Sequence, residues 1–358
     1  MKAVVVEAPG KIAVREMPMP EPGEYEALCE LLYGAICSGT DLHLFFGHPP
    51  FCHWVRYPFV LGHESIGRVV KAGRKAKNLR PGDLVTRVGA PAAAGINAGW
   101  GGFAEYGIAV DWQAMQADGH PATTWQQARV QRVLPSDISA AEATMLITWR
   151  ETWSFITRMG FRPSQRLLVI GSGGNGLAFA NHARNLGAAA VIILGSDKRA
   201  EVAAAVGAQL VDYKTPNAGE QLKTLAIDGF DAIIDAVGSA ATLEAALPFL
   251  KPGGTIAIYG FDDAGASRID VRRARGGFTF YQGGYDEAES HDAILRFMQA
   301  GLLQARYYLS NLSQPFPLTD IAEALTAVKE RRAIKALVQI NPLSVEKTAG
   351  DSCIACSS

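Results

Sequence analysis

The chain has 358 residues, of which 48% are hydrophobic and 19% charged, so it is long enough to fold into two domains with sizeable cores. Its 34 basic and 35 acidic side chains leave a formal net charge of −1, which excludes a general electrostatic attraction to nucleic acid or anionic lipid. The five cysteines show no even-spaced disulfide pattern, and no run of about 18 apolar residues is present, so we expect a cytoplasmic protein that does not span a membrane.

The first third of the chain favours β-structure, because runs of β-branched residues are separated by Pro and Gly breaks. We predict strands at residues 2–6, 12–15, 26–33, 65–71 and 84–88. Residues 89–102 are rich in Ala and Gly and are expected to form a loop. Residues 111–132 are polar with little periodicity, and we expect a surface excursion there.

Strands and helices alternate in the middle of the chain. The predicted strands are residues 167–170, 191–194, 232–235 and 255–259, and the predicted helices between them include residues 177–186, 199–206 and 242–250. This alternation is typical of βαβ units, so the predicted fold class is α/β with a doubly wound parallel sheet of the Rossmann type. Two amphipathic helices at residues 291–300 and 320–330 and a strand at residues 336–340 follow.

A glycine-rich turn joins the first strand of this region to the next helix. Its residues are Gly171-Ser172-Gly173-Gly174-Asn175-Gly176, which fit the pattern G-x-G-x-x-G. The glycines allow a tight turn and a close approach of the backbone to a pyrophosphate, which the N-terminus of the helix attracts. The pattern alone is weak, and the alternative is a glycine turn without a cofactor. The strand–turn–helix setting favours a dinucleotide site.

The end of the second strand bears on the choice between NAD(H) and NADP(H). An NAD site usually has a carboxylate there that binds both ribose hydroxyls, whereas this chain has Gly195 and Ser196 followed by Lys198 and Arg199. A small residue, a hydroxyl and two cations suit a 2′-phosphate. Asp197 would favour NAD(H) if it turned towards the ribose. On balance, we predict a preference for NADP(H) over NAD(H).

His63 and Glu64 form a second candidate site, because His beside Glu is common at metal and acid–base sites. Alone, the pair is better explained as an ordinary histidine near a turn. Its surroundings add weight, because Gly62-His63-Glu64-Ser65-Ile66-Gly67 resembles the signature of zinc alcohol dehydrogenases. Two further stretches are similar, namely Cys37-Ser38-Gly39-Thr40-Asp41-Leu42-His43 and Ile334-Lys335-Ala336-Leu337-Val338. Residues 1–340 thus resemble the zinc alcohol and polyol dehydrogenases of the medium-chain dehydrogenase/reductase superfamily.

The resemblance implies a GroES-like catalytic domain over residues 1–148 and 285–342, and a Rossmann domain over residues 149–284. Residues 343–358 are expected to be a flexible tail. In this family a zinc ion in the cleft acts as a Lewis acid on the substrate oxygen, so that hydride passes to or from the nicotinamide. The residues implied are the zinc ligands Cys37 and His63, Glu64 as a third ligand or close neighbour, the relay residues Thr40 and His43, and the nicotinamide neighbours Val237, Gly238, Tyr259 and Gly260.

The chain departs from the family pattern in three places. Residues 88–102 contain no cysteine, so we expect no structural zinc. When the stretch Thr40-Asp41-Leu42-His43 is aligned with the family pattern without a gap, the family's zinc-binding cysteine falls on Ser38. Either a one-residue bulge restores Cys37 as the ligand, or the cysteine ligand is lost. The usual third ligand falls near Ile147 or Thr148, and Glu151, one helical turn further on, can substitute for it. We still expect one catalytic zinc per chain.

These observations favour an NAD(P)-dependent dehydrogenase that acts on the CH–OH group of a small alcohol or polyol. Two alternatives stay open, a zinc-free NADPH-dependent reductase of activated double bonds and a nucleotide-binding protein without catalysis. We expect a small-molecule substrate, with Trp54 and Trp100 as part of an apolar wall, and a homodimer or homotetramer. Cys353 and Cys356 have the spacing of a redox pair, but we expect them to be part of the tail.

Overall fold

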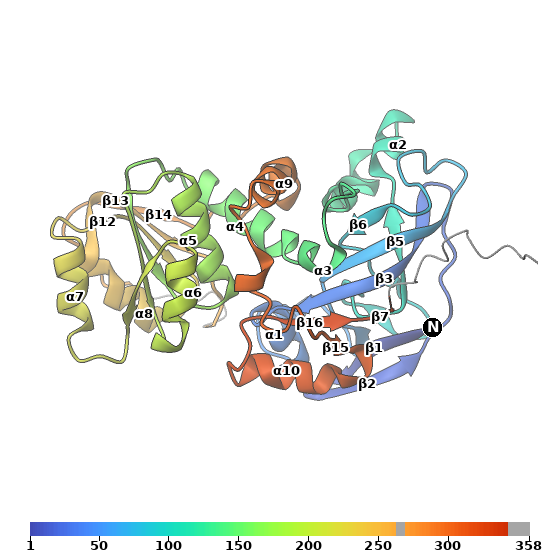
Figure 1. Cartoon of the computed structure of the whole chain (residues 1–358), viewed down its shortest axis with the longest axis horizontal. Helices are drawn as coiled ribbons and strands as arrows, with labels where there is room; N and C mark the ends of the chain where they lie inside the picture. Colours follow the sequence, from blue (N-terminus) through green and yellow to red (C-terminus); the bar gives the residue numbers. More distant parts are fainter. Residues whose placement is uncertain (263–268, 343–358) are drawn as a thin grey trace, which may run out of the picture.

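The structure is a computed structural model, and it describes residues 1–262 and 269–342. Two domains lie side by side, and helix α4 (Leu146–Arg158) runs between them (Figure 1). Cys353, Cys356 and the expected tail lie outside the described residues. Within them, no helix is long and apolar enough to cross a membrane.

The first domain is built on two sheets. The smaller has the strand order β2-β1-β4-β7, made of β2 (Lys11–Glu16), β1 (Lys2–Ala8), β4 (Phe59–Val60) and β7 (Asn97–Ala98). The larger has the order β15-β16-β3-β5-β6, and β8 also pairs with β3; the strands are β15 (Phe316–Pro317), β16 (Ala336–Gln339), β3 (Glu26–Ile36), β5 (Glu64–Ala72), β6 (Leu84–Thr86) and β8 (Tyr106–Val110).

The second domain has one six-stranded sheet in which every neighbouring pair is parallel. Its strand order is β11-β10-β9-β12-β13-β14, with the bounds β11 (Gln209–Asp212), β10 (Ala190–Gly195), β9 (Arg166–Ile170), β12 (Phe230–Asp235), β13 (Leu250–Ile258) and β14 (Thr279–Tyr281). Counted along the domain, this is the order 3-2-1-4-5-6 of dinucleotide-binding folds. The predicted Rossmann sheet is therefore confirmed.

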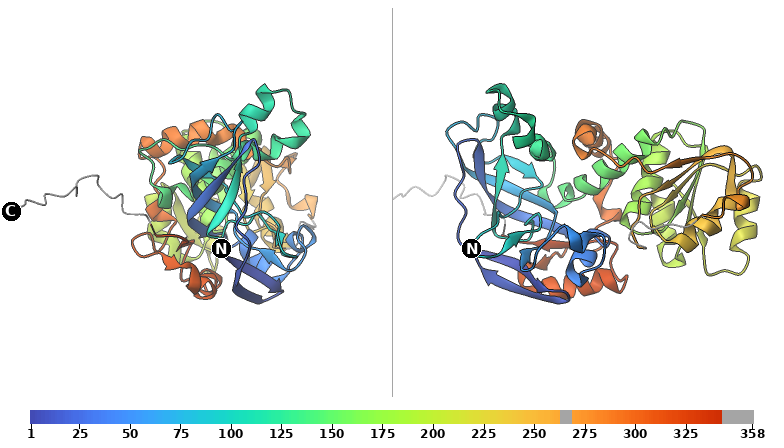
Figure 2. Two further views of the ribbon diagram at one scale, coloured as in Figure 1. Left: turned by 90° about the vertical axis from the view of Figure 1, so that its right-hand side faces the viewer. Right: turned by 180° about the vertical axis from the view of Figure 1, so that it is seen from behind.

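Helices pack against the sheets of both domains. The remaining α-helices are α1 (Thr40–Phe46), α2 (Trp112–Ala117), α3 (Ala140–Ala143), α5 (Gly174–Asn185), α6 (Ala200–Ala205), α7 (Ala218–Leu225), α8 (Ala240–Ala246), α9 (His291–Gln299) and α10 (Ile321–Lys329). After α9 the chain returns to the first domain, where β16 pairs antiparallel with β3. The view from behind shows α10 against the first domain, although it follows the Rossmann sheet in the sequence (Figure 2).

Two segments differ from their expected structure. Residues 111–132 contain α2, which Asp111 caps by accepting a hydrogen bond from the amide of Ala114, and two 3-10 turns. These short helices are not evident in the polar sequence. The ring of Trp112 in α2 stacks on the ring of Trp125, which lies between the two 3-10 turns. The strand expected at residues 84–88 ends at Thr86, because Arg87 has a φ of 59°, which interrupts the β-conformation.

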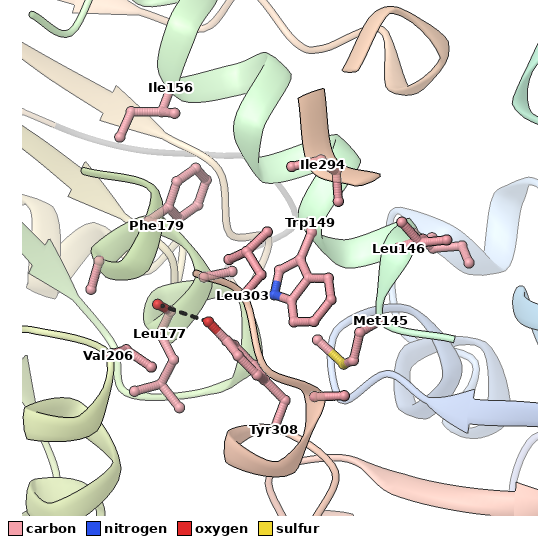
Figure 3. Packing of buried hydrophobic residues seen from close by; sticks show 14 of the residues in the cluster. Met145, Leu146, Trp149, Ile156, Leu177, Phe179, Val206, Ile294, Leu303 and Tyr308 are labelled. Atoms are coloured by element: carbon pink, nitrogen blue, oxygen red, sulfur yellow. Dashed lines mark hydrogen bonds between the residues drawn. The ribbon is translucent and has the colours of Figure 1, made fainter. Parts of the chain in front are cut away.

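A continuous apolar core joins the domains through α4. Trp149 and Tyr308 are fully buried, and their rings meet edge to face at 5.4 Å (Figure 3). The Tyr308 hydroxyl donates to the carbonyl of Leu177 in α5 at 3.4 Å, so the Rossmann domain, α4 and the returning chain share this contact. Both domains therefore hold α4 in a fixed position.

His182 in α5 is buried in the same region, with Nε2 3.1 Å from both the carbonyl oxygen of Trp149 and the hydroxyl of Thr152. Burial lowers the pKa of His182 to about 3. In the unfolded chain this histidine binds a proton below pH ~6.5. In the folded chain it binds one only below about pH 3.

We expect His182 to make the protein less stable as the pH falls from 7 to 5, by about 2 kcal/mol. His182→Gln keeps a donor for the Trp149 carbonyl and should remove that part of the pH dependence. Denaturant unfolding at the two pH values measures the difference. His53→Gln, at an exposed position, is the control. An equal loss of stability in His182→Gln and in the unmodified chain would contradict the prediction.

Candidate active site

A cavity of about 710 Å³ lies where the two domains meet. The glycine turn after β9 lines it from the Rossmann side, and the start of α1 and His63, which precedes β5, line it from the other. The carboxyl ends of the parallel strands open into such a crevice in Rossmann folds. Most of the residues predicted from the sequence line this one cavity.

The glycine turn has the backbone that its sequence predicts. Gly171 has a φ of 106°, and a Cβ placed at Gly176 would lie 1.9 Å from the carbonyl oxygen of Gly171, so both positions require glycine. Gly173, by contrast, has a φ of −78° and no atom within 4 Å of an added Cβ. Gly173, Gly174 and Asn175 line the cavity at the N-terminus of α5, where free N–H groups attract phosphate.

The turns after β12 and β13, at the same carboxyl edge of the Rossmann sheet as the glycine turn, supply Val237, Tyr259 and Gly260 to the cavity. Gly238 is packed against Gly260, because a Cβ at Gly238 would lie 2.0 Å from the Gly260 carbonyl carbon. The buried Asp235 fixes this turn by accepting hydrogen bonds from the amides of Val237 and Gly238 at 2.9 and 3.0 Å. The chain backbone is thus held where the nicotinamide is expected to lie.

The end of β10 is open and basic. Gly195, Ser196, Lys198 and Arg199 line the cavity, but Asp197 does not, and its carboxylate is 3.4 Å from the Ser196 hydroxyl. A Cβ at Gly195 would lie 2.5 Å from that of Ser172 in the glycine turn, so a larger residue is excluded there while Ser172 is present. Three further cations that the sequence analysis missed line the cavity, namely Lys214, Lys329 and Arg331.

Cys37, His63 and Glu64 form a buried cluster on the catalytic side, with one ligand atom of each within 4.8 Å of the others. Cys37 is at the end of β3, and Glu64 begins the paired strand β5. His63 Nδ1 donates to Asp41 at 3.0 Å, and the other oxygen of Asp41 accepts from the Cys37 amide at 2.8 Å. Asp41 therefore fixes both neighbours and leaves His63 Nε2 facing the cluster.

Glu64 is held by two further buried groups. Lys335 donates to both of its carboxylate oxygens at 2.7 and 2.6 Å, and the Thr148 hydroxyl donates at 2.7 Å. Burial lowers the pKa of Lys335, but Cys37 and Glu64 raise it, so that the pKa is about 12. Burial also lowers the pKa of His63. Asp41 and Cys37 raise it, and the pKa of His63 lies well above its usual value as a result. The cluster therefore attracts positive charge.

Glu151 is not in this cluster, contrary to the role suggested for it as a substitute ligand. One of its oxygens accepts from Arg87 at 2.6 Å and the other from the Tyr259 hydroxyl at 3.2 Å. Glu151 lies about one helical turn after Thr148, and this separation is enough to place its side chain on the cavity wall beside the cluster rather than in it. At the position aligned with the usual third ligand, Thr148 instead contacts Glu64.

Ser38, Thr40 and His43 line the same cavity. His43 Nδ1 contacts the carbonyl oxygen of Gly39, and its ring is 5.8 Å from that of His48. Of the two alignments considered for the cysteine ligand, the structure agrees with the one that uses Cys37, because the Cys37 thiol lies with the ligand atoms of His63 and Glu64. Trp54 and Trp100 also line the cavity, as expected for an apolar wall.

Sequence reasoning missed Asp41, Lys335 and Arg87. Two of them carry a signal, because Lys335 and Arg87 are charged residues within short apolar runs of the sequence, where an unpaired charge is costly. Such a residue implies a buried partner, although the sequence does not say which one. Asp41 carries no such signal, because its sequence neighbours Ser38, Gly39 and Thr40 are polar or small, and a charged residue is not unusual there.

Comparison with known proteins agrees with the two-domain fold. Residues 23–118 match the GroES-like domain of alcohol dehydrogenases, and residues 174–281 match the zinc-binding dehydrogenase family. The chain is 32% identical over 277 residues to a probable zinc-binding alcohol dehydrogenase of Mycobacterium tuberculosis, covering 74% of this chain and 69% of that protein. It is 25% identical to the L-galactonate-5-dehydrogenase of Escherichia coli, covering 94% and 98%.

Among solved structures, an alcohol dehydrogenase from Thermus sp. ATN1 superposes with a TM-score of 0.77 at 25% identity, covering 95% of this chain and 100% of that one. These similarities favour alcohol or polyol oxidoreduction over the two alternatives, a zinc-free reductase of double bonds and a protein without catalysis. The chain therefore belongs to the zinc-binding alcohol dehydrogenase family of the medium-chain dehydrogenase/reductase superfamily, whose members are NAD(P)-dependent oxidoreductases acting on CH–OH groups.

Proposed function

We propose that this enzyme prefers NADP(H), binds one catalytic zinc, and oxidises or forms a small alcohol or polyol. The observation that carries the proposal is that the glycine turn lines the same cavity as Cys37 and His63, two members of the buried Cys37–His63–Glu64 cluster. A nicotinamide and an alcohol carbon can therefore be held next to each other, as direct hydride transfer requires.

The cluster suits a zinc ion in its donor chemistry. A thiol sulfur, an imidazole nitrogen and a carboxylate oxygen are all zinc ligands, and three protein ligands leave a fourth position for substrate. The hydrogen bond from His63 Nδ1 to Asp41 orients Nε2 towards the cluster, as is usual for a metal-binding histidine. When bound, zinc supplies Lewis acidity that lowers the pKa of an alcohol oxygen.

The chain's own groups position the reactants around this site. Thr40, the first residue of α1, is proposed to accept a hydrogen bond from the substrate hydroxyl, and His43, one turn further along α1, to pass the proton outwards. The aromatic rings on the cavity wall exclude water from the reacting carbon. A small polyhydroxylated substrate is consistent with the relative that is named an L-galactonate-5-dehydrogenase.

The preference for NADP(H) is supported by the basic end of β10. Lys198, Arg199 and Lys214 can balance the charge of a 2′-phosphate, and Asp197 does not line the cavity. Ser172 leaves no room for a carboxylate at Gly195, which is the side chain that would bind the two ribose hydroxyls of NAD(H).

Gly173→Asp should abolish dinucleotide binding and leave the fold intact. The new side chain enters open space without backbone strain, but it brings a negative charge to the place where the pyrophosphate is expected. Fluorescence titration with NADPH measures binding, and circular dichroism measures the fold. A variant that is folded and binds NADPH as tightly as the unmodified enzyme would refute the cofactor site.

The unmodified enzyme should have a higher kcat/KM with NADP than with NAD. Gly195→Asp alone should be a poor enzyme because of the clash with Ser172, whereas Ser172→Gly together with Gly195→Asp should shift the ratio towards NAD by about tenfold or more. Ser172→Gly alone is the matched control. If NAD is preferred from the start, Asp197 rather than the cations determines the cofactor.

The purified enzyme should contain about one zinc per chain, measured by elemental analysis. Removal of the metal by a chelator should abolish alcohol oxidation but not NADPH binding, since the two sites lie on different domains. Cys37→Ala should have the same effect, and Ser38→Ala is the matched control. A metal-free enzyme that oxidises alcohols, and that chelators do not slow, would make the zinc proposal wrong.

A further inference from the structure

Arg87 and Glu151 form an ion pair on the cavity wall that neither the sequence pattern nor the zinc cluster explains. Arg87 Nη2 donates to Glu151 at 2.6 Å, and both side chains line the cavity. Only 11% of Arg87 and 13% of Glu151 is exposed. The two groups therefore meet solvent chiefly where the cavity admits it.

The pair lies beside the catalytic cluster. Arg87 Nη1 is 3.4 Å from the carbonyl oxygen of His63, a long contact that leaves most of the donor capacity of this nitrogen unused. Glu151 accepts from Arg87 and Tyr259, and each carboxylate oxygen has a second lone pair for another donor. A donor and an acceptor thus stand next to each other at the edge of the site where the reacting oxygen would bind.

The orientation of this pair is fixed before a substrate arrives. Arg87 Nε and Nη2 donate to Glu287 at 2.9 and 2.6 Å, and Glu287 is itself held by Arg150. Two carboxylates therefore restrain the guanidinium in its plane, and the positive φ of Arg87 directs it out of the strand β6. A binding group that is already oriented loses little entropy when it binds its ligand.

The charges in this network balance. Arg87 and Arg150 carry two positive charges, and Glu151 and Glu287 carry two negative ones. Burial, followed by the charges of Arg150 and Arg132, lowers the pKa of the adjacent His291 to about 3, so this histidine is neutral at pH 7. A neutral network that offers one donor and one acceptor suits an uncharged hydroxyl better than a carboxylate or phosphate.

The cavity wall also carries several aromatic rings. The ring of Trp100 is 5.8 Å from that of His63, and Phe51 contacts both Trp54 and Phe261 at 4.8 and 5.6 Å. A molecule beside His63 can therefore contact both aromatic rings and the ion pair, because all of them line the one cavity. This combination suits a carbon chain with several hydroxyl groups, whose C–H bonds pack on the rings.

We propose that the Arg87–Glu151 pair binds the hydroxyl group next to the reacting one, and that it gives the enzyme a preference for vicinal diols over simple alcohols. The neighbouring hydroxyl accepts a hydrogen bond from Arg87 Nη1 and donates one to Glu151. This inference rests on the proposed alcohol dehydrogenase activity. It assigns a specificity-determining role to two residues that lie outside the zinc cluster.

The test compares kcat/KM for 2,3-butanediol with kcat/KM for 2-butanol, because the two probes share a carbon skeleton. The unmodified enzyme should favour the diol by about tenfold or more, which is the size of a hydrogen bond to a charged group. Glu151→Gln and Arg87→Lys should each reduce this ratio by about tenfold, mainly by raising KM for the diol. A residue that only stabilised the fold would lower both activities and leave the ratio unchanged.

Glu289→Gln is the matched control, because Glu289 pairs with Arg158 and Ser154 on α4 but does not line the cavity. It should keep the ratio of the unmodified enzyme. A ratio near one in the unmodified enzyme, or an unchanged ratio in both cavity variants, would overturn the inference while the dehydrogenase activity stands. Failure to oxidise either probe, or any other alcohol, with NADP or NAD would instead refute the proposed function.

Discussion

Four charged side chains lie together where α4 passes between the domains, two of them buried and two largely shielded from solvent, and each depends on another for its charge to be tolerated. Arg87 and Arg150 both pair with Glu287, and Arg87 also pairs with Glu151. Removing one partner from such a group typically costs about 3–5 kcal/mol, because the remaining charge is buried without compensation. The network therefore fixes β6, α4 and the segment before α9 relative to one another, and the cavity wall with them.

A second ionic contact joins the catalytic cluster to the cofactor side. Lys335 immediately precedes β16 and binds Glu64, and its aliphatic stem lies 3.1 Å from the place where a Cβ would stand on Gly174 at the start of α5. One lysine thus contacts both the proposed metal site and the turn proposed to bind the pyrophosphate. The return of the chain to the first domain after α9 is what makes this possible, because β16 pairs with β3 next to Cys37.

The sequence was sufficient where the signal is local. The Gly171–Gly176 turn follows a strand and opens a helix, and its backbone meets the expectation in every position that requires glycine. The sequence was insufficient where the partner is distant. Arg87 meets Glu287 across 200 residues, and Gly195 is restricted by Ser172 of another turn. Glu151 was assigned to the metal because helical spacing gives a distance along the axis but not the neighbour that the side chain faces.

Four consecutive residues of α4 serve four different surroundings. Thr148 supports Glu64, Trp149 fills the shared core, Arg150 neutralises Glu287, and Glu151 faces the cavity. Each step along an α-helix turns the next side chain by about 100°. A single inserted or deleted residue would therefore rotate all later side chains away from their partners at once. Evolution can exchange side chains along this stretch one by one, but its length is a constraint that no compensating substitution can relieve.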